Sequence, residues 1–499
     1  MAGKRRFVRQ TVIDCYLEIG RPAASVEYAW TIPSIRITMK SNIALLAATM
    51  LVTLSLSAYA ADDSAPASAS SFAEPNGTKG ELSGVTAVSD ATNLQLLVQA
   101  HHLRSNGNFA GALAILDQLA VKLQSDPSTS PLLYTAYYDE RGWTLLRMAR
   151  PQEAISAFDS AIEQQPARYD AYLGRASARE TRGDVAGSRM DYLQFIRWAP
   201  EPTVERPLDG TISRKLGLLG IDAATARLQP FGDGNPLRDY QDGLLAKSRA
   251  ALQSAKTPEE KAKAYHDISV YLDGIERSSD ALDAVDKALA LEPASSAYKQ
   301  SKIVTLVNLN RAGDALDIAE PLRLQAHREA AASERPPEVF SKYQEASQGA
   351  AYACLLGQDW NHAIDAFADA AIGASPIDQD YMATMYLYVR AKSKEVASSN
   401  AYFENYIRQA SAPIFGNYRR SLLLYWQGRA SVRDVYEQII LLDSAVAIHL
   451  ALAELWFNAA AYEKYVRHDS DASSMYATRL NVLRPYGTNE WMLLRREAL

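Results

Sequence analysis

From about Asn93 to the C-terminus, apolar side chains recur every three or four residues, which is the spacing of one face of an α-helix. No segment shows a sustained alternation of apolar and polar residues with β-branched side chains, so we expect no sheet. Residues 61–92 differ, because they are rich in Ser, Ala, Asp, Gly and Thr and poor in large apolar residues. The pattern predicts an all-α protein preceded by a flexible linker over residues 61–92.

Within the helical region, small, aromatic and proline residues recur with a period of 34 residues. The strongest copy covers residues 135–168, and Pro200 lies one period after Pro166. Small residues let the two helices of a hairpin approach closely, aromatic residues fill the groove between hairpins, and a proline ends the second helix. We therefore expect stacked helical hairpins. In the strongest copy, positions 4, 8, 20, 24, 27 and 32 hold Tyr138, Gly142, Ala154, Phe158, Ala161 and Pro166.

Three further copies cover residues 169–202, 262–295 and 344–377. Four copies in phase, two of them contiguous, are hard to obtain by chance. The matching residues are Tyr172, Gly183 and Tyr192 in the first of these copies, Tyr265, Ala281, Ala288 and Pro293 in the second, and Trp360, Ala363, Phe367 and Ala370 in the third. Weaker copies are marked by Gly107, Phe109 and Ala112, by Ala315, and by Ala472, Tyr476 and Pro485.

This pattern resembles the tetratricopeptide repeat (TPR), a 34-residue helix–turn–helix unit with an aromatic, a Gly, an Ala, an aromatic, an Ala and a Pro at those positions. The resemblance implies an all-α fold, an α-solenoid of tetratricopeptide-like helix–turn–helix repeats, in which each hairpin covers the apolar face of its neighbour. A generic helical bundle of Ala-rich hairpins is the alternative interpretation.

Three interruptions break the helical pattern, at residues 231–236, 334–337 and 411–416, each rich in Gly or Pro. They predict three helical blocks. The first two are TPR blocks, and the third is a degenerate TPR-like block. The blocks cover residues 93–230, 240–332 and 338–499.

The N-terminal region carries an export signal over residues 39–60. Lys40 precedes an uncharged run from Ile43 to Leu56, and Ala58 and Ala60 provide the small residues that signal peptidase recognises. The apolar run is shorter than the ~20 residues that span a bilayer. We expect cleavage after Ala60 and a periplasmic or secreted protein of the bacterial exported type. We expect translation to start at Met39, so that residues 1–38 are a dubious N-terminal extension from an over-extended gene prediction. The alternative is an uncleaved signal anchor with a short cytoplasmic tail.

The charge of the chain argues against a nucleic-acid partner. The formal net charge is −6, and removal of residues 1–60, with 7 Lys/Arg and 3 Asp/Glu, changes it to −10. Phosphate binding requires clustered Lys and Arg. The dense basic cluster of Lys4, Arg5, Arg6 and Arg9 lies in the segment that we expect to be removed.

No motif for catalysis, cofactor binding or metal binding is present. The sequence has no Gly-rich phosphate loop, His-Glu-x-x-His, Cys-x-x-Cys or Gly-x-Ser-x-Gly. His101 and His102 are adjacent, so on a helix they point about 100° apart, and we expect them to be solvent-facing or half-buried. Cleavage leaves Cys354 as a single thiol, which we expect to be buried. We predict no enzyme, no cofactor and no metal.

The family resemblance implies which residues line the concave face, because repeat positions 2, 5, 9, 12 and 13 point into it. Cytosolic co-chaperones of this family carry Lys and Asn at positions 5 and 9 to hold a peptide carboxylate. Here these positions are Asp139 and Trp143, then Leu173 and Ser177, so that clamp is missing. Trp143 is either a partner anchor or packed under the next helix. The predicted protein-binding residues are Asp139, Trp143, Arg147, Asp170, Leu173, Glu180, His266, Gln348 and Tyr352.

These observations predict an exported TPR scaffold or adaptor that binds envelope or secreted proteins or peptides. Contact with a membrane is expected only if the signal sequence is uncleaved. One alternative is an accessory subunit of a polysaccharide-export or secretion machinery. Another is an enzyme with an unrecognised site, which would require polar residues that converge in a closed pocket.

Overall fold

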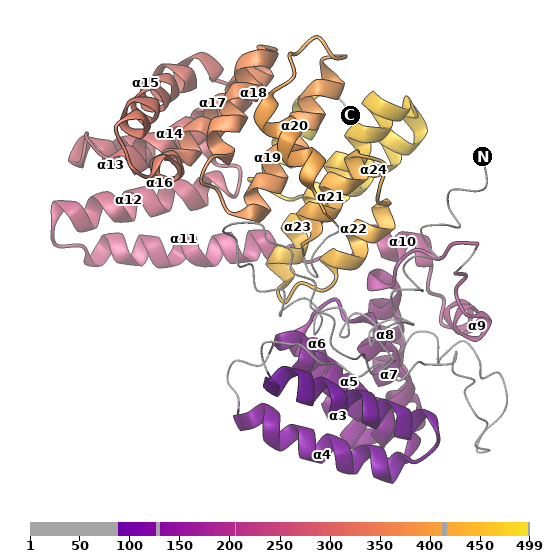
Figure 1. The fold of residues 1–499 in the computed structure, drawn as a ribbon. Coiled ribbons are helices and arrows are strands. Elements are labelled where there is room, and N and C mark those ends of the chain that lie inside the picture. Colours follow the sequence, from indigo (N-terminus) through magenta and orange to yellow (C-terminus); the bar gives the residue numbers. More distant parts are fainter. Residues whose placement is uncertain (1–87, 126–129, 205, 412–416, 498–499) are drawn as a thin grey trace, which may run out of the picture. The chain divides into compact units, whose positions relative to one another are not determined.

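The computed structural model describes residues 88–125, 130–204, 206–411 and 417–497, and every regular element in these ranges is a helix (Figure 1). The all-α prediction is confirmed. The extension 1–38 and the signal peptide 39–60 lie outside the described residues, as does most of the linker. The first described helix begins at Val88, so the helical region starts five residues before Asn93.

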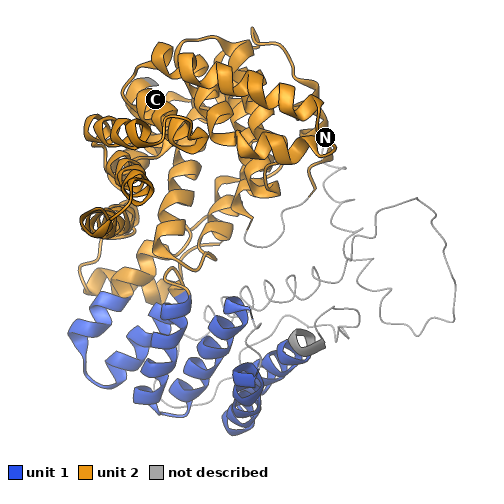
Figure 2. Ribbon diagram, turned by 90° about the vertical axis from the view of Figure 1, so that its left-hand side faces the viewer, with its two compact units in different colours: residues 1–164, 170–191 blue, residues 165–169, 192–499 orange. Residues whose placement is uncertain are grey.

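The described chain divides into two compact units (Figure 2). Unit 1 contains the chain up to residue 164 together with residues 170–191, and unit 2 contains residues 165–169 and 192–499. The boundary after Asp191 falls inside helix α8. The predicted interruption at residues 231–236 lies within unit 2, between two of its helices. The division into three blocks stays a prediction.

Unit 1 is built from consecutive antiparallel hairpins, as the repeat predicts. In the strongest copy, Ser130 caps the first helix, whose N1 position is a proline, and Ala149 takes a left-handed conformation at the turn. The first residue of α7 and the last turns of α8 already belong to unit 2. The helices are α3 (Val88–Ser105), α4 (Phe109–Ser125), α5 (Pro131–Arg147), α6 (Pro151–Gln164), α7 (Tyr169–Thr181) and α8 (Val185–Trp198).

The repeat signature explains the core of unit 1. Phe158 is fully buried, and its ring lies against Gly142 and Gly174. A Cβ atom added to these two glycines would come within 2.6 and 2.2 Å of the Phe158 ring. Small residues at these positions are therefore needed for the aromatic residue at position 24 to pack between helices.

Unit 2 continues the hairpins with helices of more variable length, from 6 residues in α10 to 20 residues in α15 (Figure 1). Thr257 caps the helix that begins at Pro258, since its hydroxyl accepts from the Glu260 N–H while the Glu260 carboxylate accepts from the Thr257 N–H. The helices up to the fourth copy are α9 (Gly210–Leu218), α10 (Ala223–Leu228), α11 (Pro236–Ser254), α12 (Pro258–Asp273), α13 (Ser278–Leu291), α14 (Ser296–Asn308), α15 (Ala312–Ala331), α16 (Pro336–Lys342), α17 (Gln344–Leu356) and α18 (Trp360–Ala371). The remaining ones are α19 (Pro376–Lys392), α20 (Ala401–Gln409), α21 (Tyr418–Trp426), α22 (Val432–Ile439), α23 (Ala445–Tyr462), the π-helical turn η2 (Glu463–Arg467), α24 (Ser470–Leu483) and α25 (Asn489–Glu497).

The most apolar helix of unit 2 lies in its core. Residues Ala445–Arg467 are long and apolar enough to cross a membrane, but 72% of the most apolar window is buried inside the protein. Cys354 is also buried, as the sequence predicts, and burial raises the pKa of its thiol to about 11. A thiol with this pKa is a poor nucleophile at neutral pH.

Candidate functional site

The first helices of three hairpins in unit 2 line a groove, which we name the A-helix groove. Helices α12, α14 and α17 supply most of its wall, and its cavity has a volume of about 340 Å³. Val270 and Val304 lie in it one 34-residue period apart and remain 42% and 38% exposed. Both valines hold position 9 of their repeats, so the repeat itself generates an exposed apolar stripe.

Polar groups flank this stripe. Asp273, at the end of α12, is buried and accepts hydrogen bonds from Thr305 Oγ1 (3.3 Å), Asn308 Nδ2 (2.8 Å) and Ser278. Burial raises the pKa of Asp273, although these hydrogen bonds favour its ionised form. Among the described residues, nothing donates a hydrogen bond to the buried Oε1 of Gln241, which also lines the groove. A side-chain amide with an unpaired oxygen therefore forms part of the groove wall.

Three residues that the sequence assigned to the concave face lie in this unit. Gln348 and Tyr352 line the groove together. Tyr352 is buried, however, and its hydroxyl lies 2.5 Å from that of Tyr381. His266 is half-buried, stacks on Tyr298 at 4.8 Å between ring centroids, and its Nε2 lies 2.7 Å from Ser301 Oγ. Gln348 is the member of the three best placed to contact a partner.

The C-terminal segment forms one end of the groove, which the repeat pattern did not predict. Gly487 and Asn489 are part of the lining, and a Cβ atom on Gly487 would come within 2.5 Å of the Cα atom of Gly274. Gly487 also has a φ of +75°, which favours glycine. Arg496 donates to the carbonyl oxygen of Asn308 (2.7 Å), and Arg495 pairs with Glu276 (2.6 Å). Helix α25 is thus anchored to the ends of α12 and α14.

A buried polar chain connects the groove to α25. The Tyr381 hydroxyl contacts Tyr352 and donates to Glu490 Oε1 at 2.9 Å. Burial and the nearby charge of Glu454 raise the pKa of Glu490 from 4.5 to about 7. A raised pKa is the expected result of burying a carboxyl group next to a second carboxylate.

We expect the Glu490→Gln variant to be more stable than the wild type above pH 7, by on the order of 3 kcal/mol, from 1.36 kcal/mol per pKa unit. The folded protein keeps the Glu490 proton between pH 4.5 and about 7, whereas the unfolded chain loses it. The free energy of unfolding therefore falls as the pH rises through this window. Below pH 4.5 the two proteins should be equally stable. Urea denaturation at several pH values measures the difference, with the exposed Glu338→Gln as control. A difference that does not depend on pH would contradict this assignment.

The residues of unit 1 that the sequence predicts on the concave face differ in their burial. Asp139, Asp170 and Leu173 are buried, whereas Arg147 is exposed and Glu180 is half-buried. Trp143 is half-buried and packs edge-on against Phe158, at 5.5 Å between ring centroids. Trp143 therefore contributes to the core of the hairpin, and its role in binding a partner stays a prediction.

The expectation that His101 is solvent-facing or half-buried is wrong. His101 is buried, and its Nδ1 lies 3.1 Å from the Glu140 carboxylate, which also pairs with Arg104 at 2.5 Å. Burial raises the pKa of Glu140, but Arg104 and the hydrogen bond from His101 outweigh it and lower the pKa to about 2. Glu140 belongs to a structural ion pair that the sequence did not reveal, because its partners lie 36 and 39 residues away. No group of three or more potential metal ligands occurs among the described residues.

The hairpins and the groove between their first helices define the class of the protein, an α-solenoid of the TPR type. No family model and no curated protein sequence matches the chain. Similar solved structures include the crystal structure of the APC/C hetero-tetramer Cut9–Hcn1, with 13% identity over 80% of this chain and 81% of that chain and a TM-score of 0.23. Another is the crystal structure of yeast Tom70, with 15% identity over 79% of this chain and 88% of that chain and a TM-score of 0.20. The class rests on the 34-residue repeat and on the helical hairpins that it forms.

Proposed function

We propose that this protein is an exported scaffold that holds a segment of another protein in the A-helix groove. The observation that carries the proposal is the exposed stripe of Val270 and Val304, flanked by Gln241 and Gln348. Amide side chains both donate and accept hydrogen bonds, so they can pair with the backbone of an extended or helical segment. The valines supply the apolar area that such a segment buries.

The charge of the groove indicates which segment it prefers. Asp273 and Glu345 line it, and none of its lining residues is Lys or Arg. We therefore expect a partner segment with an apolar anchor beside a basic residue. The proposal assigns no catalytic role to the chain.

The export signal that the sequence predicts over residues 39–60 supports an envelope or secreted partner. N-terminal sequencing of the secreted protein should give a first residue near Ala61. A protein that retains residues 39–60 would contradict export by cleavage.

Affinity capture from the cell envelope with the mature chain tests the groove. We expect the Gln348→Arg variant to capture ~10-fold less partner than the wild type, or less still. The long cationic side chain would block the groove and repel a basic segment. The matched control is Gln325→Arg, which places the same substitution on an exposed position of α15. Equal capture by both variants would contradict the proposed site.

A further inference from the structure

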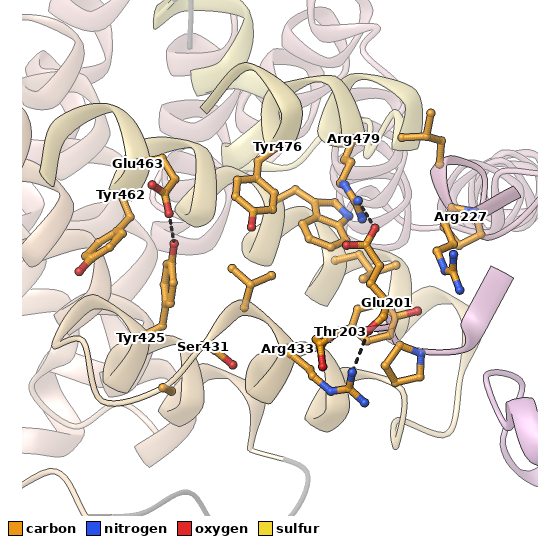
Figure 3. A pocket seen from close by; sticks show the side chains of 18 of the residues that line it. Glu201, Thr203, Arg227, Tyr425, Ser431, Arg433, Tyr462, Glu463, Tyr476 and Arg479 are labelled. Carbon is orange, nitrogen blue, oxygen red and sulfur yellow. Dashed lines mark hydrogen bonds and ion pairs between the residues drawn. The ribbon is translucent and has the colours of Figure 1, made fainter. Parts of the chain in front are cut away.

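Unit 2 contains a second and larger cavity, which we name the arginine pocket. Its volume is about 510 Å³, and it lies between residues 197–230 and helices α21 to α24 (Figure 3). Tyr476 and Arg479 lie on one side of it, and Ser431 and Arg433 lie on the opposite side. A cavity of this size accommodates a small organic ligand.

The charge of the arginine pocket is opposite to that of the whole chain. Five arginines and two glutamates line it, although the chain carries a net charge of −6. Glu201 pairs with Arg479, and Glu463 pairs with Arg467 at 3.2 Å. The two lining carboxylates are thus already paired. The lining arginines are Arg197, Arg227, Arg433, Arg467 and Arg479.

Two of these arginines have buried donors without an acceptor in the described part of the chain. Within the described ranges, nothing accepts a hydrogen bond from Nε and Nη2 of Arg227 or from Nε of Arg197. Burial lowers the pKa of both guanidinium groups. Buried cationic donors without an acceptor are costly, since each N–H group loses its hydrogen bond to water. An anion in the pocket would supply the missing acceptors.

Aromatic rings form the rest of the wall. Trp456 and Tyr476 stack at 5.9 Å between ring centroids with an interplanar angle of 11°, and Arg479 lies over Trp456 at 4.9 Å. Tyr436 stacks on the same tryptophan at 6.3 Å. Flat aromatic surfaces beside guanidinium groups suit a ligand that combines a ring with a negative charge.

We propose that the arginine pocket binds a small anionic molecule in which a phosphate or carboxylate group is attached to a ring. The guanidinium groups of Arg227 and Arg197 bind the anionic group, because their planar N–H donors match the oxygen atoms of phosphate and carboxylate. The ring of the ligand packs against the aromatic wall around Tyr476. The arginine pocket shares no lining residue with the A-helix groove, so this proposal stands apart from the proposed function.

Calorimetric titration of the mature chain tests the proposal, with glucose 6-phosphate, glucuronic acid, inorganic phosphate and uncharged glucose as probes. We expect one of the two ring-bearing anions to bind with a dissociation constant below about 1 mM, and glucose not to bind. Arg227→Met should weaken binding at least ~10-fold, as expected for the loss of a charge-assisted hydrogen bond. The matched control is Arg335→Met, which removes an exposed arginine of the same unit outside the pocket and should bind like the wild type.

Thermal unfolding separates a binding role of Arg227 from a structural one. The Arg227→Met variant should melt at or above the wild-type temperature, because it removes a buried guanidinium group whose Nε and Nη2 have no acceptor among the described residues. Equal binding by Arg227→Met, or no binding of either ring-bearing anion by the wild type, would overturn the proposal. Inorganic phosphate that binds as tightly as glucose 6-phosphate would overturn the assignment of the ring to the aromatic wall.

Discussion

Replacing Phe158 with alanine is expected to lower the free energy of unfolding of unit 1 by about 3–5 kcal/mol, the usual range for a buried Phe-to-Ala change. The Phe158 ring is fully buried against Gly142 and Gly174, and it contacts Trp143 edge-on. Glycine has no side chain that can move into the space, so the variant should keep most of the cavity. A loss of this size would show that Phe158, the aromatic residue at position 24 of the repeat, stabilises the packing of neighbouring hairpins.

Hydrogen exchange in α5 and α6 measures this loss in unit 1 separately from unit 2. The matched control is Phe109→Ala at the start of α4, where the ring is only half-buried. This control should lose on the order of 1 kcal/mol, in proportion to the smaller apolar area that it buries. Equal losses in the two variants would contradict the repeat packing described for unit 1.

The second large effect is expected for Arg419→Met, which should destabilise unit 2 by about 3–5 kcal/mol. Arg419 donates to Glu454 at 2.6 Å and to Asp378 at 2.7 Å, and Tyr418 also donates to Glu454 at 3.1 Å. Burial lowers the pKa of Arg419, but the charge of Glu454 and its hydrogen bond outweigh this and raise the pKa. Removal of the cation leaves Glu454 buried without its main charge partner.

A double variant tests this explanation. Arg419→Met combined with Glu454→Gln should recover much of the lost stability in urea denaturation, because the buried charge is then removed as well. The exposed pair of Arg335 and Glu338 provides the comparison, since Arg335→Met should cost no more than about 1 kcal/mol. A loss for Arg419→Met as small as that of Arg335→Met would show that the buried pair does not stabilise unit 2.

The helical hairpins could be predicted from the sequence because their determinants are local. Gly142, Phe158 and Pro166 lie within one period, and each acts on a neighbouring helix. The same is true of the N-cap at Thr257 and Glu260. A regular repeat also places equivalent side chains on one face, and Gln348, which the repeat position predicts on the concave face, lines the A-helix groove.

The buried polar chain and the arginine pocket could not be predicted, because they depend on contacts between segments that lie far apart in the sequence. Tyr352 holds a position that usually faces the concave surface, but Tyr381 from the next hairpin covers it, and Glu490 lies a further 109 residues along the chain. The arginine pocket likewise brings Arg227 close to residues of α22 to α24. Scattered arginines in a chain of negative net charge give no local signal for such a pocket.

Hydrogen exchange of the mature chain with and without its captured partner shows whether the partner lies in the A-helix groove. If the A-helix groove holds the partner, protection should increase in α12, α14 and α17, which line the groove. The second helices of the same hairpins, α13, α15 and α18, should change little. Protection confined to α13, α15 and α18, or to unit 1, would contradict the account.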